Sequence, residues 1–307
     1  MTLLSRISVL AAKVEATPGT LETLTAAEAA FNVMNAEFNA NIDVTTRPIQ
    51  GSFRKLPGVP GSQLATCSFS LELIGTGAGA VPTWATTFLS ACGIVNTTGT
   101  LTPRNETPGT NVKTLSIALH EGGRVKRMRG AVGTVVFEIT PGQAVMANFT
   151  FTGVFDSIAD TAIISPTYPT LLPIRAANGA ATINSVAQAF STCSFDVGNV
   201  ITVRPSVASA QGATFFVITD RTPVFNIDPE ATVLSGNDIW ADWVAATTRA
   251  LSIQIEDASD RITFAAPAVQ RMTIANGDRE GLRLDTQTLQ CCRDGANAEF
   301  SITFDEP

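Results

Sequence analysis

Residues 64–93 read LATCSFSLELIGTGAGAVPTWATTFLSACG and predict a strand, a glycine-rich connection and a short helix. The first ten residues alternate between apolar and polar, which predicts a strand with one face in a core and the other in water. Pro82 suits the first turn of the helix, and Trp84 and Phe88 lie one turn apart on one face. Gly93 suits a left-handed stop at the end of that helix. The chain is therefore expected to be mainly β, with short helices beside its sheets.

The second half of the chain contains a weaker copy of this stretch. The sequence TPVFNIDPEAT alternates in the same way, and SGNDIWADWVAATT predicts another short helix. Two aromatic pairs keep one separation of 156 positions, namely Phe69 with Phe225 and Trp84 with Trp240. Two flanking blocks also match, FNANIDVTTRP at 38–48 with FDVGNVITVRP at 195–205, and LSIALHEGGRVKRM at 115–128 with LSIQIEDASDRITF at 251–264.

Matches that recur in the same order predict a tandem duplication. The spacing is constant inside each block and changes only at a polar loop predicted for residues 94–111. We therefore predict two β-sandwich or barrel domains, 1–165 and 166–307, each with one short flanking helix. The proline-rich segment 160–180 supplies the boundary. The alternative is two unrelated β domains that happen to share their alternation.

The composition limits the classes of function open to the chain. Of its 307 residues, 45% are hydrophobic and only 15% are charged, and the net charge is −7. Such a chain either folds around a large core or covers much of its surface with copies of itself. An acidic protein is not expected to bind nucleic acid by gripping phosphates. Arg6 interrupts the apolar run at the N-terminus, so we expect no secretory signal, no membrane span and a soluble protein made in the cytoplasm.

No pattern of residues predicts catalysis, a cofactor or a metal site. Gly75, Gly77 and Ala80 satisfy a dinucleotide-binding motif on paper, but the preceding strand alternates and is not the buried parallel strand that such a site needs. His120 is the only histidine and adjoins a predicted hairpin turn, so we expect it to be exposed and not catalytic. The five cysteines have no metal-ligand spacing, and Cys67 is expected in the core.

The outward-facing positions of the predicted strands carry acids, amides and hydroxyls, without lysine or arginine. They are Asn39, Asn41, Asp43, Thr66, Ser68, Ser70, Glu72, Asn148, Thr150, Thr152, Asp196, Asn226 and Asp228. One interpretation is the ordinary wet face of a sheet. The other is a smooth, neutral-to-negative wall along which a polyanion slides without sticking.

Basic residues concentrate in two places. The run GRVKRMRG contributes Arg124, Lys126, Arg127 and Arg129, and the loop PIQGSFRKLPGVPGSQ contributes Arg54 and Lys55. These side chains are interpreted either as contacts to an acidic partner, a neighbouring subunit or nucleic acid, or as a solvated hairpin surface. The glycine and proline spacing of the loop also permits a long protruding hairpin.

Taken together, these segments resemble the tail tube proteins of long-tailed, siphovirus-type bacteriophages, over nearly the whole chain. The segments that carry the resemblance are LAAKVEATPGT (10–20), VTTRP (44–48), ATCSFSLELIGTG (65–77), AVPTWATTFLSACG (80–93), GRVKRMRGAVGTVVFEI (123–139), NFTFTGVF (148–155), VITDRTPVFNI (217–227) and ITFAAPAVQ (262–270). The most specific pair is AKVEATPGT with the P-x-W helix that ends in ACG.

The resemblance implies a structural virion protein without enzymatic activity. It implies β-sandwich domains whose rings stack into a hollow tube for DNA ejection. The polar set above, apart from Thr66 and Thr152, would face the lumen. Because rings of this family usually contain six single domains, a duplicated chain implies a trimer with pseudo-sixfold symmetry, and a hexamer of single chains is the second choice. The implied partners are further copies of the chain, the tape-measure protein, the tail-terminator and distal tail proteins, and double-stranded DNA in transit.

The resemblance also implies a location and contacts between copies. The protein would be made in the host cytoplasm and would end in the phage tail. The N-terminal arm and the loop at 48–63 resemble segments that bridge stacked rings in this family. An inter-subunit or inter-ring role is our hypothesis for the six basic residues. The alternative function is a ligand-binding or adhesin-type β-sandwich, which predicts a monomer with a concave polar or aromatic cluster.

Overall fold

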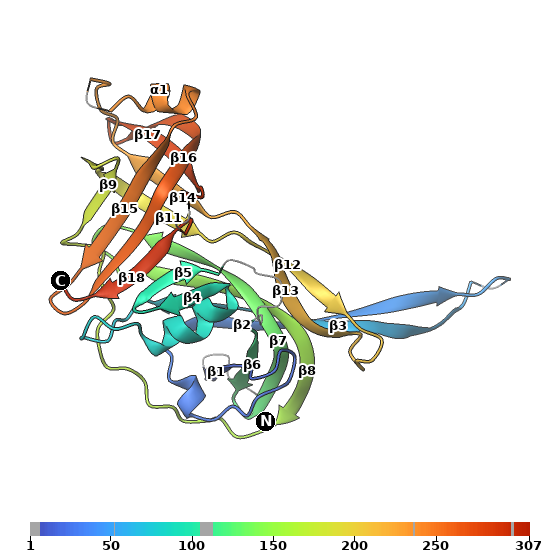
Figure 1. Cartoon of the computed structure of the whole chain (residues 1–307). Helices are drawn as coiled ribbons and strands as arrows, with labels where there is room; N and C mark the ends of the chain where they lie inside the picture. Colours follow the sequence, from blue (N-terminus) through green and yellow to red (C-terminus); the bar gives the residue numbers. More distant parts are fainter. Residues whose placement is uncertain (1–6, 52, 105–112, 236, 296–297) are drawn as a thin grey trace.

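The computed structural model describes residues 7–51, 53–104, 113–235, 237–295 and 298–307. Sixteen strands form one sheet that runs through both halves of the chain, and β12 and β13 pair as a separate hairpin (Figure 1). The prediction of a mainly β fold is confirmed. Within the described residues, no helix combines the length and the apolar character that crossing a membrane requires.

The first half builds its part of the sheet from antiparallel hairpins. Its elements are β1 (Ser8–Val14), the 3₁₀ turn η1 (Ala27–Ala29), β2 (Val33–Pro48), β3 (Lys55–Glu72), the short π-helix η2 (Ala85–Leu89), β4 (Ile94–Thr97), β5 (Thr100–Pro103), β6 (Leu115–Glu121), β7 (Arg124–Ile139) and β8 (Met146–Asp160). β6 turns into β7 at Gly122 and Gly123, both of which have positive φ, as the glycine pair predicts.

The second half begins after an extended segment without strands, and it is also built from antiparallel strands. Its elements are β9 (Ala180–Ile183), β10 (Val186–Ala187), β11 (Phe190–Asp196), β12 (Asn199–Pro205), β13 (Ala213–Arg221), β14 (Val224–Pro229), the helix α1 (Ile239–Val244), β15 (Thr248–Glu256), β16 (Arg261–Arg279), β17 (Leu282–Cys291) and β18 (Ser301–Asp305).

The order of paired strands is the same in the two halves. The first half pairs as β2-β3-β8-β7-β6-β1, and the second half pairs as β11-β14-β17-β16-β15-β9. Each half also places its helix at the same point of the chain, η2 between β3 and β6 and α1 between β14 and β15. Duplication of one domain would produce this repetition, and the division into 1–165 and 166–307 stays our prediction for the domain organisation.

β7 and β11 join the two halves edge to edge. Phe195 on β11 lies opposite Phe137 on β7, and Asp196 lies opposite Val136. The rings of Phe137 and Phe195 stack with centroids 6.0 Å apart, and Phe195 stacks on Phe225 at 4.2 Å. One hydrophobic core therefore continues from the first half into the second.

Phe88 on η2 is the centre of the core in the first half. Its ring lies 4.8, 5.0, 5.4 and 6.1 Å from the rings of Phe31, Phe69, Phe149 and Phe151. The alternation of β3 and β8 places Phe69, Phe149 and Phe151 on the same face, and the helical turn directs Phe88 onto them. The apolar face predicted for the helix is confirmed.

Two long hairpins extend from the sheet, and they differ in their surroundings. The β2–β3 hairpin projects far from the body of the molecule, whereas β12–β13 lies against the first half (Figure 1). The projecting hairpin agrees with the glycine and proline spacing of the loop at 48–63, although its strands extend to Pro48 and resume at Lys55.

The expected match between Trp84 and Trp240 is wrong. Trp84 is only 7% exposed and donates its indole N–H to the carbonyl of Ile74 at 2.9 Å, while Trp240 is 38% exposed and packs against Trp243. The two halves also differ in register, because Phe195 pairs with Phe225 whereas Phe38 pairs with Cys67 and not with Phe69. The two helices thus occupy the same place in the chain order without matching residue by residue.

Two further expectations are corrected by contacts between distant segments. His120 is 4% exposed, because β6 lies between β1 and β7 with Val9 on one side and Val125 on the other. The loop expected at 94–111 contains the hairpin β4–β5, because β5 pairs with the C-terminal strand β18. Residues 105–112 of that loop lie outside the described residues.

We predict that Phe88→Ala costs about 3–5 kcal/mol of unfolding free energy, since it removes the ring on which the others pack. Thr86→Ala, on the exposed side of the same helix, is the control and should change stability by less than about 0.5 kcal/mol. Denaturant unfolding of the purified chain measures both, and equal effects would contradict the assignment of Phe88 to the centre of the core.

We also predict an acid-dependent loss of stability that comes from His120. Burial and the neighbouring Arg127 lower the pKa of His120 in the folded chain. The unfolded chain therefore takes up a proton at a higher pH than the folded chain, so stability should fall as the pH drops below about 6.5. His120→Gln should remove most of the decrease in melting temperature between about pH 7.5 and about pH 5.5. An unchanged decrease in this variant would contradict the prediction, because the chain has no other histidine.

Candidate functional site

Polar side chains form a continuous face of the sheet, from β3 in the first half to β16 in the second. The strand register aligns one row across this face: Glu72, Met146, Glu138, Ser194, Asn226, Thr288 and Thr273. It aligns a second row beside the first: Ser70, Asn148, Val136, Asp196, Val224, Gln290 and Gln270. Because side chains alternate along a strand, the residues between these rows point into the core. We call these two rows the polar face.

Hydroxyls and amides of the polar face bond to one another across strands. Ser70 Oγ donates to Asn148 Oδ1 at 2.7 Å, and Thr288 Oγ1 donates to Asn226 Oδ1 at 3.0 Å. Such cross-strand pairs hold side chains flat against the sheet and use up part of their hydrogen-bonding capacity. The rest of the polar face mixes short side chains with longer ones such as Glu72, Glu138 and Gln290.

The charged residues in the two rows are all carboxylates. Glu72 lies on β3, Glu138 on β7 and Asp196 on β11, and neither row contains a lysine or arginine. A surface with this charge repels a polyanion at long range instead of binding its phosphates. We therefore expect the polar face to bind a polyanion only weakly.

Asp228, which also lies on β14, is held by the strand next to it. Its carboxylate accepts the backbone N–H groups of Ser191 and Thr192 at 2.9 and 2.7 Å, as well as the Ser191 hydroxyl, and Arg279 lies 3.9 Å away. Burial alone would raise the pKa of Asp228, but these hydrogen bonds outweigh burial and the pKa lies below its ordinary value. Asp228 is therefore ionised and structurally engaged.

The structure brings together most of the polar residues predicted from alternation. Besides the members of the two rows, Ser68 pairs with Thr150 next to them, and Asn39 pairs with Thr66 at the margin. Asn41 donates to Thr66 at 3.2 Å where β2 leaves the sheet, and Asp43 lies beyond it on the projecting hairpin, away from the rows. Whether these residues face a lumen stays a prediction.

Sequence reasoning missed Glu138, although the signal was present. The segment AVGTVVFEI alternates, which places Glu138 on the same side of β7 as Val136. Sequence reasoning also missed that the β12–β13 hairpin covers one end of the polar face. There β13 packs Ala213 and Phe216 onto Val132 and Val154, on the side of the sheet that carries Thr152.

The predicted basic residues are largely engaged within the chain. Arg124 and Lys126 bond to Glu121 at 3.0 and 2.9 Å, and Arg129 lies 3.4 Å from Asp156. Arg129 also donates to Gln211 Oε1 at 2.9 Å on the β12–β13 hairpin. Arg127 is half-buried, whereas Arg54 and Lys55 are exposed at the tip of the projecting hairpin. Their predicted contacts to other copies stay predictions.

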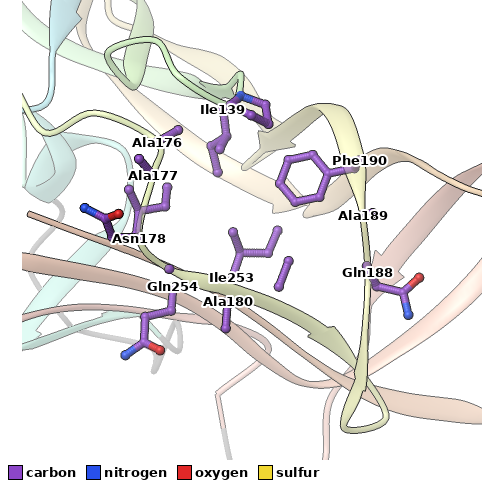
Figure 2. Close-up of a pocket in the computed structure, with 14 residues that line it drawn as sticks. Ile139, Ala176, Ala177, Asn178, Ala180, Gln188, Ala189, Phe190, Ile253 and Gln254 are labelled. Atoms are coloured by element: carbon purple, nitrogen blue, oxygen red, sulfur yellow. The ribbon is translucent and has the colours of Figure 1, made fainter. Parts of the chain in front are cut away.

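A cavity between the two halves offers no catalytic chemistry. Figure 2 shows it with Ile139, Phe190 and Ile253 facing inward and the amides of Asn178 and Gln254 at its rim. It has a volume of about 220 Å³, and its lining contains no acid, base or nucleophilic side chain. It is a packing gap at the junction of the halves and not a candidate active site.

Metal-ligand clusters and cysteine thiols are the other groups that could carry chemistry. Among the described residues, no cluster of three or more histidine, cysteine or acidic side chains could hold a metal ion. All five cysteines lie within the described residues and are free thiols. Burial raises the pKa of Cys67 and of Cys193 to about 12, which keeps these thiols protonated and unreactive near neutral pH.

Comparison with known proteins agrees with this picture. The model of the family described as phage tail tube protein matches residues 5–301, nearly the whole chain, which confirms the resemblance stated from the sequence. No curated protein matches the chain.

We predict that Arg129→Ala loosens the β12–β13 hairpin from the first half, because it removes the hydrogen bonds to Gln211 and to the carbonyl of Thr214. The loss should be about 2 kcal/mol, as is usual for hydrogen bonds of a charged group. Hydrogen exchange should become faster across residues 199–221. Arg127→Ala, two positions away, is the control, and similar exchange in both variants would contradict the prediction.

Proposed function

The chain belongs to the phage tail tube protein family and is thus a structural component of a phage tail, and on that premise we propose that three copies close into a ring. The rings stack into the hollow tube through which DNA leaves the virion. The polar face lines this tube, and the protein acts by shape and charge instead of by catalysis.

The observation that carries the proposal is the edge-to-edge pairing of β7 with β11. This junction joins two similar halves through backbone hydrogen bonds and a shared aromatic core. Among the described residues, the corresponding edges at the two ends of the polar face have no strand beside them. β2 pairs with β3 alone, and residues 273–279 of β16 pair with β17 alone.

The free edges of β2 and β16 correspond to the edges of β11 and β7, which pair with each other within the chain. By the repeated strand order, β2 corresponds to β11 and β16 corresponds to β7. The β2 edge of one copy can therefore pair with the β16 edge of the next copy as β11 pairs with β7. An open edge is prone to uncontrolled association, and closing the sheet into a barrel removes it.

The count of three combines the two similar halves in each chain with the six single domains that rings of this family usually contain. A ring of six half-chains then has six junctions, three within chains and three between them. All six place the polar face on the same side of the closed sheet, since side chains alternate in phase along paired strands. A trimer with pseudo-sixfold symmetry is thus the ring we propose, ahead of a hexamer of whole chains.

The electrostatics of the polar face suit passage of double-stranded DNA. Carboxylates such as Glu72 and Glu138 keep phosphates from settling on the wall, and short hydroxyl and amide side chains leave the path smooth. The tape-measure, tail-terminator and distal tail proteins are the further partners of such a tube. Arg54 and Lys55 at the hairpin tip, with Arg124, Lys126, Arg127 and Arg129, are proposed to contact neighbouring copies.

Electron microscopy of the purified protein tests the proposal directly. We expect rings or tubes, with a ring mass of three chains by native mass spectrometry. A stable monomer at high concentration would reject the proposal, and a ring of six chains would reject the pairing of its halves.

Charge reversal on the polar face gives a separate prediction for DNA passage. Glu72→Lys with Glu138→Lys should leave assembly intact but slow DNA ejection by about tenfold or more, because lysines hold phosphates as they pass. Glu72→Gln with Glu138→Gln is the matched control, which removes charge without adding adhesion. Ejection kinetics from phage carrying each variant measure this effect, and equal rates for the two pairs would contradict the assignment of the polar face to the lumen.

A further inference from the structure

The two long hairpins of the chain are related in sequence and in pairing. The first contains VTTRP at 44–48 and the second contains ITVRP at 201–205. In the first, Val44 pairs with Pro60 and Thr45 with Val59. In the second, Ile201 pairs with Ile218 and Thr202 with Val217. Val44 and Ile201 thus hold corresponding places.

The second hairpin is docked on the first half of its own chain. Ile201 and Ile218 pack against the small cluster that contains Val132 and Val154. A side chain on Gly130 would lie 2.7 Å from the Cα of Phe215, so the two backbones are in direct contact there. This hairpin therefore covers the part of the polar side of the sheet next to Gly130.

Polar contacts fasten both ends of the docked hairpin. At its base, Asn199 Nδ2 donates to the carbonyls of Cys92 and Gly133 at 2.8 and 2.9 Å. Near its tip, the backbone N–H of Gln63 donates to the carbonyl of Gln211 at 3.0 Å. The docking is thus a formed interface and not a chance contact.

The first hairpin has the same construction and no such cover. Ile42 and Val44 are 43% and 61% exposed, and Leu56 and Val59 are exposed as well. Apolar side chains gathered on a projecting element usually mark a surface that another protein covers.

A groove in the second half occupies the place that corresponds to Gly130. Leu115 pairs with Ala131 in the first half, and Leu251 pairs with Ala266 in the second. Ala265 therefore stands where Gly130 does. The groove of about 480 Å³ beside it is lined largely by apolar groups, and its accessible side chains include Ala250, Ala265 and Pro267. In the first half the corresponding place is filled by β13.

We propose that this groove receives the β2–β3 hairpin of a neighbouring copy, with the side chain of Val44 directed toward it. The inference rests on the proposed ring, in which the first half of one chain follows the second half of another. The occupant is a second copy because the hairpin of the same chain projects away from β15, β16 and β18, which line the groove (Figure 1). The hairpin would then clasp the neighbour within the ring, as β12–β13 clasps the first half within the chain.

A pair of adjacent substitutions tests this docking. Val44→Asp places a charge on the side of the hairpin that enters the groove, whereas Thr45→Asp places it on the opposite side, as the exposed Thr202 indicates. Because both residues are exposed in the single chain, neither variant should change the melting temperature of the monomer. Val44→Asp should raise the concentration for half-assembly by about tenfold or more, and Thr45→Asp should leave it near that of the unmodified chain.

Photo-crosslinking locates the contact. The residue p-benzoylphenylalanine is placed at position 44, and tubes are assembled from a mixture of isotopically heavy and light chains. We expect heavy-to-light crosslinks to peptides that contain residues 250–252, 265–267 or 300–301. Crosslinks to other segments, or only within one chain, would overturn the proposal.

The outcomes separate this inference from the proposed function. If unmodified chains form rings but Val44→Asp assembles like Thr45→Asp, the hairpin docking is wrong and the ring stands. If unmodified chains form no ring at any concentration tested, both are wrong.

Discussion

The hydrogen-bonding requirement of open strand edges is the constraint on which the structure depends. An antiparallel sheet avoids uncontrolled association only if its edges are paired, covered or kept from other chains. In this chain β11 pairs with the edge of β7, and the aromatic rings of Phe137 and Phe195 stack across this junction. The same solution is open to the edges of β2 and β16, provided that another copy supplies the strand.

Alternation along the strands links this constraint to function. Phenylalanines on one side build a core that runs through both halves, which leaves serine, threonine, asparagine and carboxylates on the other side. Cross-strand hydrogen bonds such as Ser70 to Asn148 use the polar groups to stiffen the wall. If the polar face acts only through its weak negative charge and its shape, many residues contribute to it. No single residue then has to act as a binding or catalytic site.

Local sequence patterns predict the parts of the fold that depend on residues close together in the sequence. The strand around Phe69, the turn at Gly122 and Gly123 and the apolar face of η2 all follow from period and turn chemistry. His120 and Trp240 were misjudged because their burial is decided by β1 in one case and by the lack of cover over α1 in the other. The outward-facing positions of β3 and β8 could be predicted from their alternation. The docking of β12–β13 could not, because no local pattern tells a docked hairpin from a projecting one.

Hydrogen exchange, compared between the single chain and the assembled tube, tests the central claim that open edges of the sheet pair between copies. We expect strong protection on assembly at residues 33–41 of β2 and 273–279 of β16, with little change at the β7–β11 junction, which is already paired. Assembled tubes in which both of those edges still exchange as fast as in the single chain would contradict it.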